Sequence, residues 1–270
     1  MTIRLFLRYD GSGFSGWQIQ NKDGAEREGL VTVQGTLNKA LRTLLCDDSI
    51  KVTGCSRTDA GVHALEYCAS FEAKDSIVPP DRICRALTPL LPETLTVYRS
   101  EQAPDGFNAR YDTVRKTYVY DFHCGEFPVP SLKNTSWFVK TPVQPDLALM
   151  NEAASILLGT HRFDAFCGDL SNAKTTERTL YELRVTKLRE RPSKDVVLYR
   201  LTASGDGFLY NMVRIIAGTL VDTGLGKLTP AGVEAALLSG MRKDAGRTAP
   251  PQGLFLKKIY LRDDKEIKPR

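Results

Sequence analysis

Strand-like apolar runs alternate along this chain with segments whose apolar residues have the spacing of a helix. Residues 2–9 are rich in Ile, Leu, Phe and Tyr and predict a strand, and residues 33–45 carry apolar side chains at helical spacing. The second half repeats this order, with a predicted strand at 114–122 and a predicted helix at 147–158. Strands and helices mixed in each half predict an α+β fold, with antiparallel sheets covered by helices on one face.

The remaining elements follow from the same patterns. Further strands are predicted at 50–54, 64–71, 95–98, 180–188, 196–203 and 254–261, and further helices at 79–92, 210–220 and 230–238. Residues 125–145 contain four prolines and predict a long irregular connection. We divide the chain into an N-terminal half at 1–108 and a C-terminal half at 109–270.

Composition is that of an ordinary globular protein and leaves the function open. Hydrophobic residues make up 42% and charged residues 26% of the 270, and the formal net charge is +5. That charge fits an anionic partner such as nucleic acid, but many unrelated enzymes share it.

The cysteines and histidines indicate neither a disulfide framework nor a metal site. The six cysteines are scattered without a Cys-x-x-Cys pair, and the three histidines lie far apart, so no zinc-binding spacing occurs. Arg4 and Arg8 interrupt the N-terminal apolar run, and no apolar run has the length of a membrane span. We therefore expect a soluble, cytoplasmic protein with reduced thiols and no membrane contact.

Asp59 lies at the centre of the sequence Arg-Thr-Asp-Ala-Gly-Val-His-Ala, residues 57–64. Gly54 and Gly61 bracket it between two apolar runs, so the carboxylate is expected on a turn between strands, two residues from Arg57. A charged group held in this way can react, but turn-forming aspartates and surface ion pairs are common. On the triplet alone, a structural role is favoured over a chemical one.

Three other segments combine aromatic, basic and amide side chains close to glycines, as the Asp59 loop does in part. They are residues 9–18, residues 107–110 with 115–118, and residues 208–214. RNA-modifying sites need this mixture, because Arg and Lys contact phosphates while aromatic rings stack on unstacked bases. The mixture is suggestive of such a site without being specific to it.

The chain resembles the tRNA pseudouridine synthase A family from end to end. The matching segments are residues 9–20, 32–45, 54–64, 107–120, 159–166, 207–227 and 249–256. Two segments are highly specific: the one around Asp59, and Phe-Leu-Tyr-Asn-Met-Val-Arg-Ile-Ile-Ala-Gly-Thr-Leu at 208–220. A chance match to all seven segments in order is not credible.

This resemblance implies an isomerase that converts uridine to pseudouridine in the anticodon stem-loop of tRNA, at tRNA positions 38–40 in the family. It implies the pseudouridine synthase fold, with two similar halves of antiparallel sheet with helices and an active-site cleft between them, and a homodimer. No cofactor and no metal are expected, because the reaction needs no redox change or external group donor. The alternative is a non-catalytic tRNA-binding or tRNA-folding protein on the same scaffold. An aspartate-dependent hydrolase is poorly supported, because no metal-binding carboxylate cluster or phosphate loop accompanies the aspartate.

The resemblance also implies catalytic roles. Asp59 matches the catalytic aspartate, which would attack the sugar, add to the base or remove a sugar proton. Arg57 matches an arginine that helps to extrude the target nucleotide, and Arg214 one that pairs with the aspartate and keeps it ionised. Tyr118 matches the ring that stacks on the uracil, although packing within a strand is a strong rival on the residues alone.

Four further residues are expected to contact the substrate. Leu254 lies in the last strand motif of the family and would supply an apolar wall beside the base. Arg110, Arg115 and Lys116 would contact the RNA. His63, although close to Asp59, is expected to order the loop rather than to transfer a proton.

Three departures from the family pattern leave these candidates unchanged. Cys55-Ser56 replaces the commoner Ala-Gly pair before Arg57, and Glu66-Tyr67 replaces Gly-Gln after it. Arg162 stands where an acidic residue is usual. We expect these changes to affect loop flexibility and RNA contacts, and hence which uridines are accepted.

Overall fold

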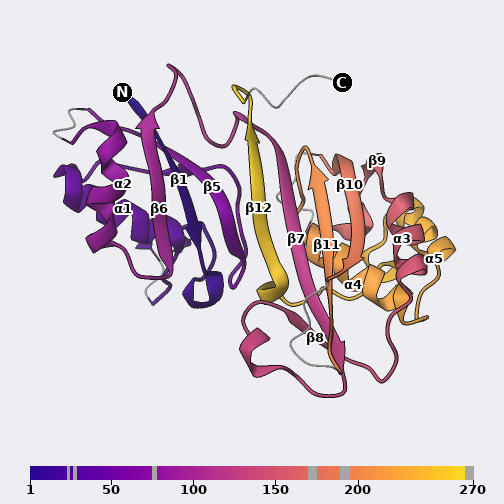
Figure 1. Ribbon diagram of the computed structural model, residues 1–270. Helices are drawn as coiled ribbons and strands as arrows, with labels where there is room; N and C mark the ends of the chain where they lie inside the picture. Colours follow the sequence, from indigo (N-terminus) through magenta and orange to yellow (C-terminus); the bar gives the residue numbers. More distant parts are fainter. Residues whose placement is uncertain (23–24, 27–28, 75–77, 170–174, 189–194, 265–270) are drawn as a thin grey trace. The chain divides into compact units, whose positions relative to one another are not determined.

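In the computed structural model the chain forms two compact units, and the backbone passes from one to the other twice (Figure 1). Unit 1 comprises Met1–Val114 and Leu256–Arg270, and unit 2 comprises Arg115–Phe255. Both passages are made by extended chain, since they fall within strands β7 (Thr113–Gly125) and β12 (Leu254–Leu261). The structure describes residues 1–22, 25–26, 29–74, 78–169, 175–188 and 195–264.

The sheet of unit 1 has the strand order β6-β1-β5-β12. β1 (Thr2–Tyr9) pairs antiparallel with β5 (His63–Glu72) on one side and with β6 (Leu95–Gln102) on the other. A short strand, β4 (Thr53–Gly54), pairs antiparallel with β5. The alternate residues Ile3, Leu5 and Leu7 of β1 are fully buried, because side chains two residues apart point to the same face of a strand.

Two helices accompany this sheet, and the N-terminal one shows how the sequence begins and ends a helix. At α1 (Val33–Leu45) the hydroxyl of Thr32 accepts a hydrogen bond of 3.2 Å from the N–H of Gly35, and the helix ends at Cys46 in the left-handed conformation. The shorter α2 (Ile83–Leu87) packs against β6. Unit 1 also contains a two-stranded pair, β2 (Asn21–Lys22) with β3 (Ala25–Glu26).

The sheet of unit 2 has the strand order β7-β11-β10-β9, and its neighbouring strands are antiparallel. Its strands besides β7 are β9 (Gly159–Arg162), β10 (Glu177–Lys187) and β11 (Val197–Gly205). The four-residue β8 (Trp137–Lys140) adds to β7 in parallel. Stacked rings of Phe122 and Tyr199, with centroids 5.0 Å apart, face each other across β7 and β11 in the core of this unit.

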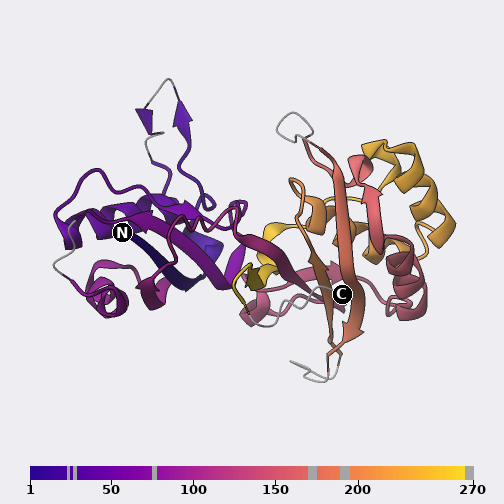
Figure 2. The same ribbon diagram turned by 90° about the horizontal axis from the view of Figure 1, so that it is seen from above.

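The helices of unit 2 lie together on one side of its sheet (Figure 2). α3 (Leu147–Ile156) packs against β10, α4 (Met212–Gly224) and α5 (Pro230–Ser239). The carboxylate of Asp146 accepts hydrogen bonds from the first N–H groups of α3, and the hydroxyl of Thr229 caps α5. α4 is buried around its whole circumference, and among its residues Arg214 alone is not buried.

The α+β class predicted from the sequence is confirmed, and three local predictions were wrong. Only Thr53–Gly54 of the predicted strand 50–54 pairs with a strand. Before Thr53, side chains of α1 take the backbone hydrogen bonds that a neighbouring strand would otherwise make. Asn38 accepts a hydrogen bond from the N–H of Val52 at 2.9 Å, and Gln34 donates one to the carbonyl of Val52 at 2.8 Å. The predicted helix 79–92 is regular only over Ile83–Leu87, and the connection 125–145 contains β8. No helix in the described ranges is long and apolar enough to span a membrane.

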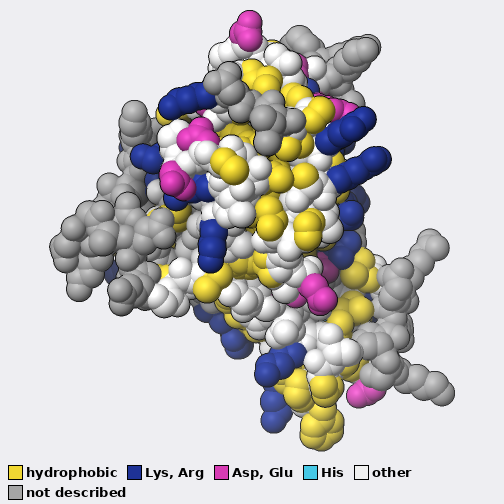
Figure 3. Space-filling model, turned by 90° about the vertical axis from the view of Figure 1, so that its left-hand side faces the viewer, with side chains coloured by type: hydrophobic (Ala, Val, Ile, Leu, Met, Phe, Trp, Pro, Cys, Tyr) yellow, Lys and Arg dark blue, Asp and Glu magenta, His cyan; other side chains and the backbone are white. Residues whose placement is uncertain are grey.

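Basic and apolar side chains are interspersed on the face of the molecule at the left of Figure 1, where unit 1 lies (Figure 3). On the strands of this unit, the guanidinium of Arg99 lies 3.7 Å from the centre of the Phe6 ring, and that of Arg8 lies 5.1 Å from the Tyr98 ring. Arginines stacked on rings in this way keep their charge while covering apolar surface.

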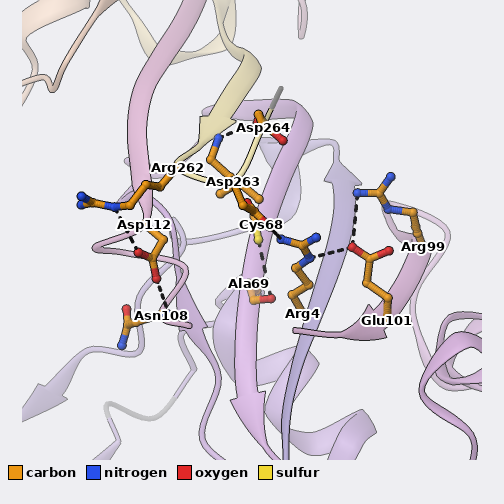
Figure 4. A network of polar contacts seen from close by, with 11 residues as sticks. Arg4, Cys68, Ala69, Arg99, Glu101, Asn108, Asp112, Arg262, Asp263 and Asp264 are labelled. Carbon is orange, nitrogen blue, oxygen red and sulfur yellow. Dashed lines mark hydrogen bonds and ion pairs between the residues drawn. The ribbon is translucent and has the colours of Figure 1, made fainter. Parts of the chain in front are cut away.

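A network of charged groups fastens the end of β12 to unit 1 (Figure 4). Arg4 on β1 donates to Glu101 at 2.6 Å and to Asp263, just beyond β12, at 2.7 Å. Burial lowers the pKa of Arg4, but these two carboxylates raise it by more. Arg262 reaches Asp112, with 3.5 Å between its Nε and the carboxylate. These contacts tie Arg262 and Asp263 to earlier residues of unit 1, and the division of the chain into halves at residue 108 stays a prediction.

Candidate active site

The Asp59 loop belongs to unit 1 and connects β4 to β5. Its residues alternate in exposure: Thr58 is buried, Arg57 is exposed and Asp59 is half-buried. The structure therefore leaves the Arg57 and Asp59 side chains accessible, Arg57 more than Asp59, on either side of a buried residue.

Backbone hydrogen bonds fix this segment to the loop that follows β1. The N–H of Trp17 donates to the carbonyl of Thr58 at 3.0 Å, and the N–H of Gly61 donates to the carbonyl of Phe14 at 3.3 Å. Gly16 has φ +92°, and a Cβ at this position would lie 2.7 Å from the carbonyl oxygen of Thr58. Only glycine allows both this conformation and this close approach of the two loops.

His63, the first residue of β5, is 2% exposed. Its Nδ1 lies 3.1 Å from the N–H of Gly11 and 3.1 Å from a carboxylate oxygen of Asp10. A neutral ring accepts the Gly11 hydrogen bond, and a protonated ring donates to Asp10. Either contact orders the loop after β1, whereas an ordering role in the Asp59 loop itself stays a prediction.

Tyr118 lies on β7 in unit 2, opposite Ala203 of β11. Its ring is only 5% exposed and meets the ring of Phe208 edge to face, with centroids 5.1 Å apart and planes at 83°. Phe208 belongs to the loop before α4, so this contact joins two of the aromatic segments that the sequence singled out. Tyr118 therefore packs inside unit 2, as the structural alternative to stacking on the uracil expects.

Arg214 lies in the first turn of α4. Its Nε donates to the carbonyl of Ala249 at 2.8 Å, and its Nη1 donates to the side-chain oxygen of Asn211 at 2.7 Å. The backbone N–H of Ala249 donates in return to the carbonyl of Arg214 at 3.0 Å. Two directed hydrogen bonds hold the planar guanidinium in one orientation, as a specific ion pair requires.

The remaining candidates take up separate positions. Leu254 begins β12 and is buried in unit 2, whereas Arg110 lies in an exposed loop of unit 1. Arg115 on β7 donates to the hydroxyl of Ser204 at 2.7 Å and lies over the ring of Tyr181. Lys116, its neighbour on β7, stands opposite Gly205.

Within each unit, the structure therefore gathers part of the predicted site. Arg57 and Asp59 share a loop in unit 1, and Arg115, Lys116 and Tyr118 share a strand in unit 2. The approach of Tyr118 and Arg214 to Asp59 stays a prediction. Across the described ranges, no three His, Cys, Asp or Glu residues are grouped so that they could hold a metal ion.

Comparisons with known proteins give the family. A family model described as tRNA pseudouridine synthase matches residues 153–260. The "tRNA pseudouridine synthase A 2" of Clostridium tetani is 40% identical over 96% of this chain and 98% of its own length. The "tRNA pseudouridine synthase A" of Bacillus subtilis is 40% identical over 96% and 99%, and that of Thermoanaerobacter sp. is 39% identical over 96% and 98%. Similarity of this extent shows that the chain belongs to the tRNA pseudouridine synthase A family.

Proposed function

We propose that this protein is an isomerase that converts uridine to pseudouridine in the anticodon stem-loop of tRNA. The observation that carries the proposal is that the exposed Arg57 and the half-buried Asp59 flank a buried Thr58, whose carbonyl is anchored to a neighbouring loop. Family membership over 96% of the chain supports the same reaction class.

The proposed reaction rearranges bonds without adding or removing atoms. The bond between ribose C1′ and uracil N1 breaks, the uracil turns, and a new bond joins C1′ to C5. The hydrogen on C5 leaves as a proton, and N1 gains a proton. A carboxylate suits this chemistry because it can act on the electron-poor ribose carbon or remove a proton, and Asp59 is the group we assign to it.

Four other residues complete the proposed site. A stacked base is out of reach of Asp59, so the nucleotide must be extruded at a cost of roughly a few kcal/mol, and the exposed Arg57 is suited to take its place. Tyr118 and Leu254 would hold the extruded uracil on apolar surfaces, and Arg214 would pair with Asp59. The fixed orientation of the Arg214 guanidinium supports this last role.

Contacts with the rest of the tRNA come from basic residues. The net charge of +5 favours binding of a polyanion, and we assign Arg110, Arg115 and Lys116 to phosphate or base contacts. We also propose a homodimer, for which light scattering is the test; a mass near the 30.0 kDa of one chain would contradict it. None of the six cysteines, all in the described ranges, forms a disulfide; this fits a reducing compartment, and we place the protein in the cytoplasm.

Release of tritium tests the proposed reaction. A tRNA labelled with tritium at C5 of uracil loses the label as pseudouridine forms, whereas a protein that only binds or folds tRNA leaves it in place. We expect stoichiometric release by the wild-type protein without an added cofactor, and no release by Asp59→Asn. Tight tRNA binding without release by the wild-type protein would favour the non-catalytic alternative.

A further inference from the structure

Two tyrosine hydroxyls hold the chain on either side of Arg57. The hydroxyl of Tyr67 bonds to the backbone carbonyl of Ser56, which directly precedes Arg57, and lies 3.4 Å from the N–H of the same residue. The hydroxyl of Tyr9 lies 2.8 Å from that of Thr58, which directly follows Arg57. Arg57 therefore lies between a peptide carbonyl held by Tyr67 and a side-chain hydroxyl held by Tyr9.

The two tyrosines are themselves held rigidly in the core of unit 1. Tyr67 is fully buried, and its ring stacks on that of Trp17 with centroids 4.2 Å apart. On its other side the Tyr9 ring lies at 5.8 Å. Trp17 also donates its backbone N–H to the carbonyl of Thr58. Three residues with packed rings, from β1, β5 and the loop after β1, thus supply two hydroxyls and one backbone N–H to residues 56–58.

The position of the Tyr67 hydroxyl depends on a missing side chain. A Cβ on Gly54 would lie 2.1 Å from the Tyr67 oxygen and 2.4 Å from the Trp17 ring, so the end of β4 must be glycine for the tyrosine to reach Ser56. Tyr67 and Ser56 are also two of the positions at which this chain departs from the family pattern. The structure shows that these two departures touch each other.

We propose that Tyr67 is a positioning residue for Arg57, and that this inference deepens the proposed base-extruding role of that arginine. The Tyr67 hydroxyl fixes the peptide before Arg57, while Tyr9 and Trp17 hold the side-chain hydroxyl and the carbonyl of the next residue, Thr58. The backbone of Arg57 then has a defined position. The Arg57 side chain can enter the space that the extruded nucleotide leaves, because the loop does not first have to change conformation. Without the hydroxyl, the segment before Arg57 loses its anchor, and the extrusion step slows.

Tyr67→Phe tests this role, because it deletes one oxygen and keeps the stacked ring. We expect kcat for pseudouridine formation to fall roughly tenfold, while KM for tRNA changes by less than about twofold, since binding precedes extrusion. Ser100→Ala is the matched control in the same unit. It also deletes a buried hydroxyl that meets backbone, at 2.8 Å from the N–H of Cys84, and is expected to leave kcat unchanged. A purely structural role would lower the stability of both variants and leave both kcat values alone.

A double-mutant cycle shows whether Tyr67 acts through Arg57. In an Arg57→Ala background, Tyr67→Phe is expected to lower kcat by less than about twofold, because the residue it positions is gone. A full tenfold loss in that background, or an unchanged kcat for Tyr67→Phe alone, overturns the inference. If Tyr67→Phe does not fold, Tyr9→Phe tests the anchor after Arg57 in the same cycle. An inactive wild-type protein would instead refute the proposed function, so the two failures are distinguishable.

Discussion

The guanidinium of Arg214 donates a hydrogen bond of 2.7 Å to the side-chain oxygen of Asn211, the residue immediately before its own helix. Asn211 adopts the left-handed conformation, with φ 61°, and its side chain caps no helical N–H. An asparagine at a helix start normally accepts a backbone N–H. Here the Asn211 oxygen accepts a hydrogen bond from the guanidinium instead, and this hydrogen bond helps to orient Arg214.

Asn211→Gly is expected to slow pseudouridine formation without unfolding the protein. Glycine tolerates the positive φ, so the variant removes the acceptor and leaves the backbone unstrained. Loss of a hydrogen bond to a charged group costs about 1.5–3 kcal/mol, and we expect kcat to fall roughly tenfold or more. Single-turnover rates and urea unfolding measure the two effects. A normal rate with normal stability would show that Asn211 does not orient Arg214.

Gly11→Ala is expected to destabilise the loop after β1, and Gly13→Ala is its matched control. A Cβ at Gly11 would lie 2.1 Å from the carbonyl oxygen of Val62, whereas one at Gly13 meets nothing within 4 Å. We expect the free energy of unfolding to fall by about 1–3 kcal/mol for the first and by less than about 0.5 kcal/mol for the second. Equal values for the two variants would contradict the close approach of this loop to Val62, the residue before β5.

Asp10 is expected to contribute to stability in a pH-dependent way. Burial raises the pKa of this carboxyl group, but the N–H of Ser12 and the nearby His63 lower it by more, so in the folded protein it lies below its ordinary value near 3.9. The ionised form therefore favours folding. The contribution is complete above the ordinary value and is lost as pH falls through the lowered pKa.

Asp10→Asn removes this dependence and leaves the other carboxylates in place. Urea unfolding of both proteins from pH 6 down to about pH 2 is expected to show a difference in stability that is constant at the upper end and narrows on acidification. A difference that grows with acidification would reverse the sign we assign to the Asp10 interaction.

Arg110→Gln is expected to weaken tRNA binding through the loss of one phosphate contact. Its side chain is exposed in the loop before β7, so removal costs the fold little. Each phosphate contact contributes about 0.7–0.9 to the slope of log affinity against log salt, and we expect the slope to fall by that amount. Arg85→Gln on α2 carries the same charge change and should leave the slope as it is. A common slope for the wild-type protein and Arg110→Gln would remove Arg110 from the RNA contacts.

The sequence predicted the elements that carry strong local patterns. Helix α1 occupies the predicted residues 33–45, and β12 the predicted residues 254–261, because apolar spacing and end residues determine such segments locally. β9 was not predicted, since none of its four residues is buried and no apolar alternation marks it. β8 depends on parallel pairing with β7, a contact that a local pattern does not show.

The candidate site divides in the same way. Arg57 and Asp59 came from a contiguous and specific motif, and the structure leaves both at least partly exposed on one short segment. From the sequence, Tyr67 stands out only as a departure from the family pattern. Its contact with Ser56 depends on how β4 and β5 pair, on the stacking of Trp17 and on the absence of a side chain at Gly54. This contact joins residues eleven positions apart through tertiary packing, and the spacing of residues in the sequence does not predict it.

The direct test of the catalytic role of Asp59 is single-turnover conversion of a uridine-bearing tRNA by the wild-type protein and by Asp59→Asn, with tRNA affinity measured in parallel. The substitution removes the carboxylate charge and keeps the shape of the side chain. We expect nucleoside chromatography to show pseudouridine in the anticodon arm with the wild-type protein and none with Asp59→Asn, while affinity changes by less than roughly threefold, since phosphate contacts dominate binding. Pseudouridine formed by Asp59→Asn at the wild-type rate would contradict the assignment of Asp59 as the reacting group.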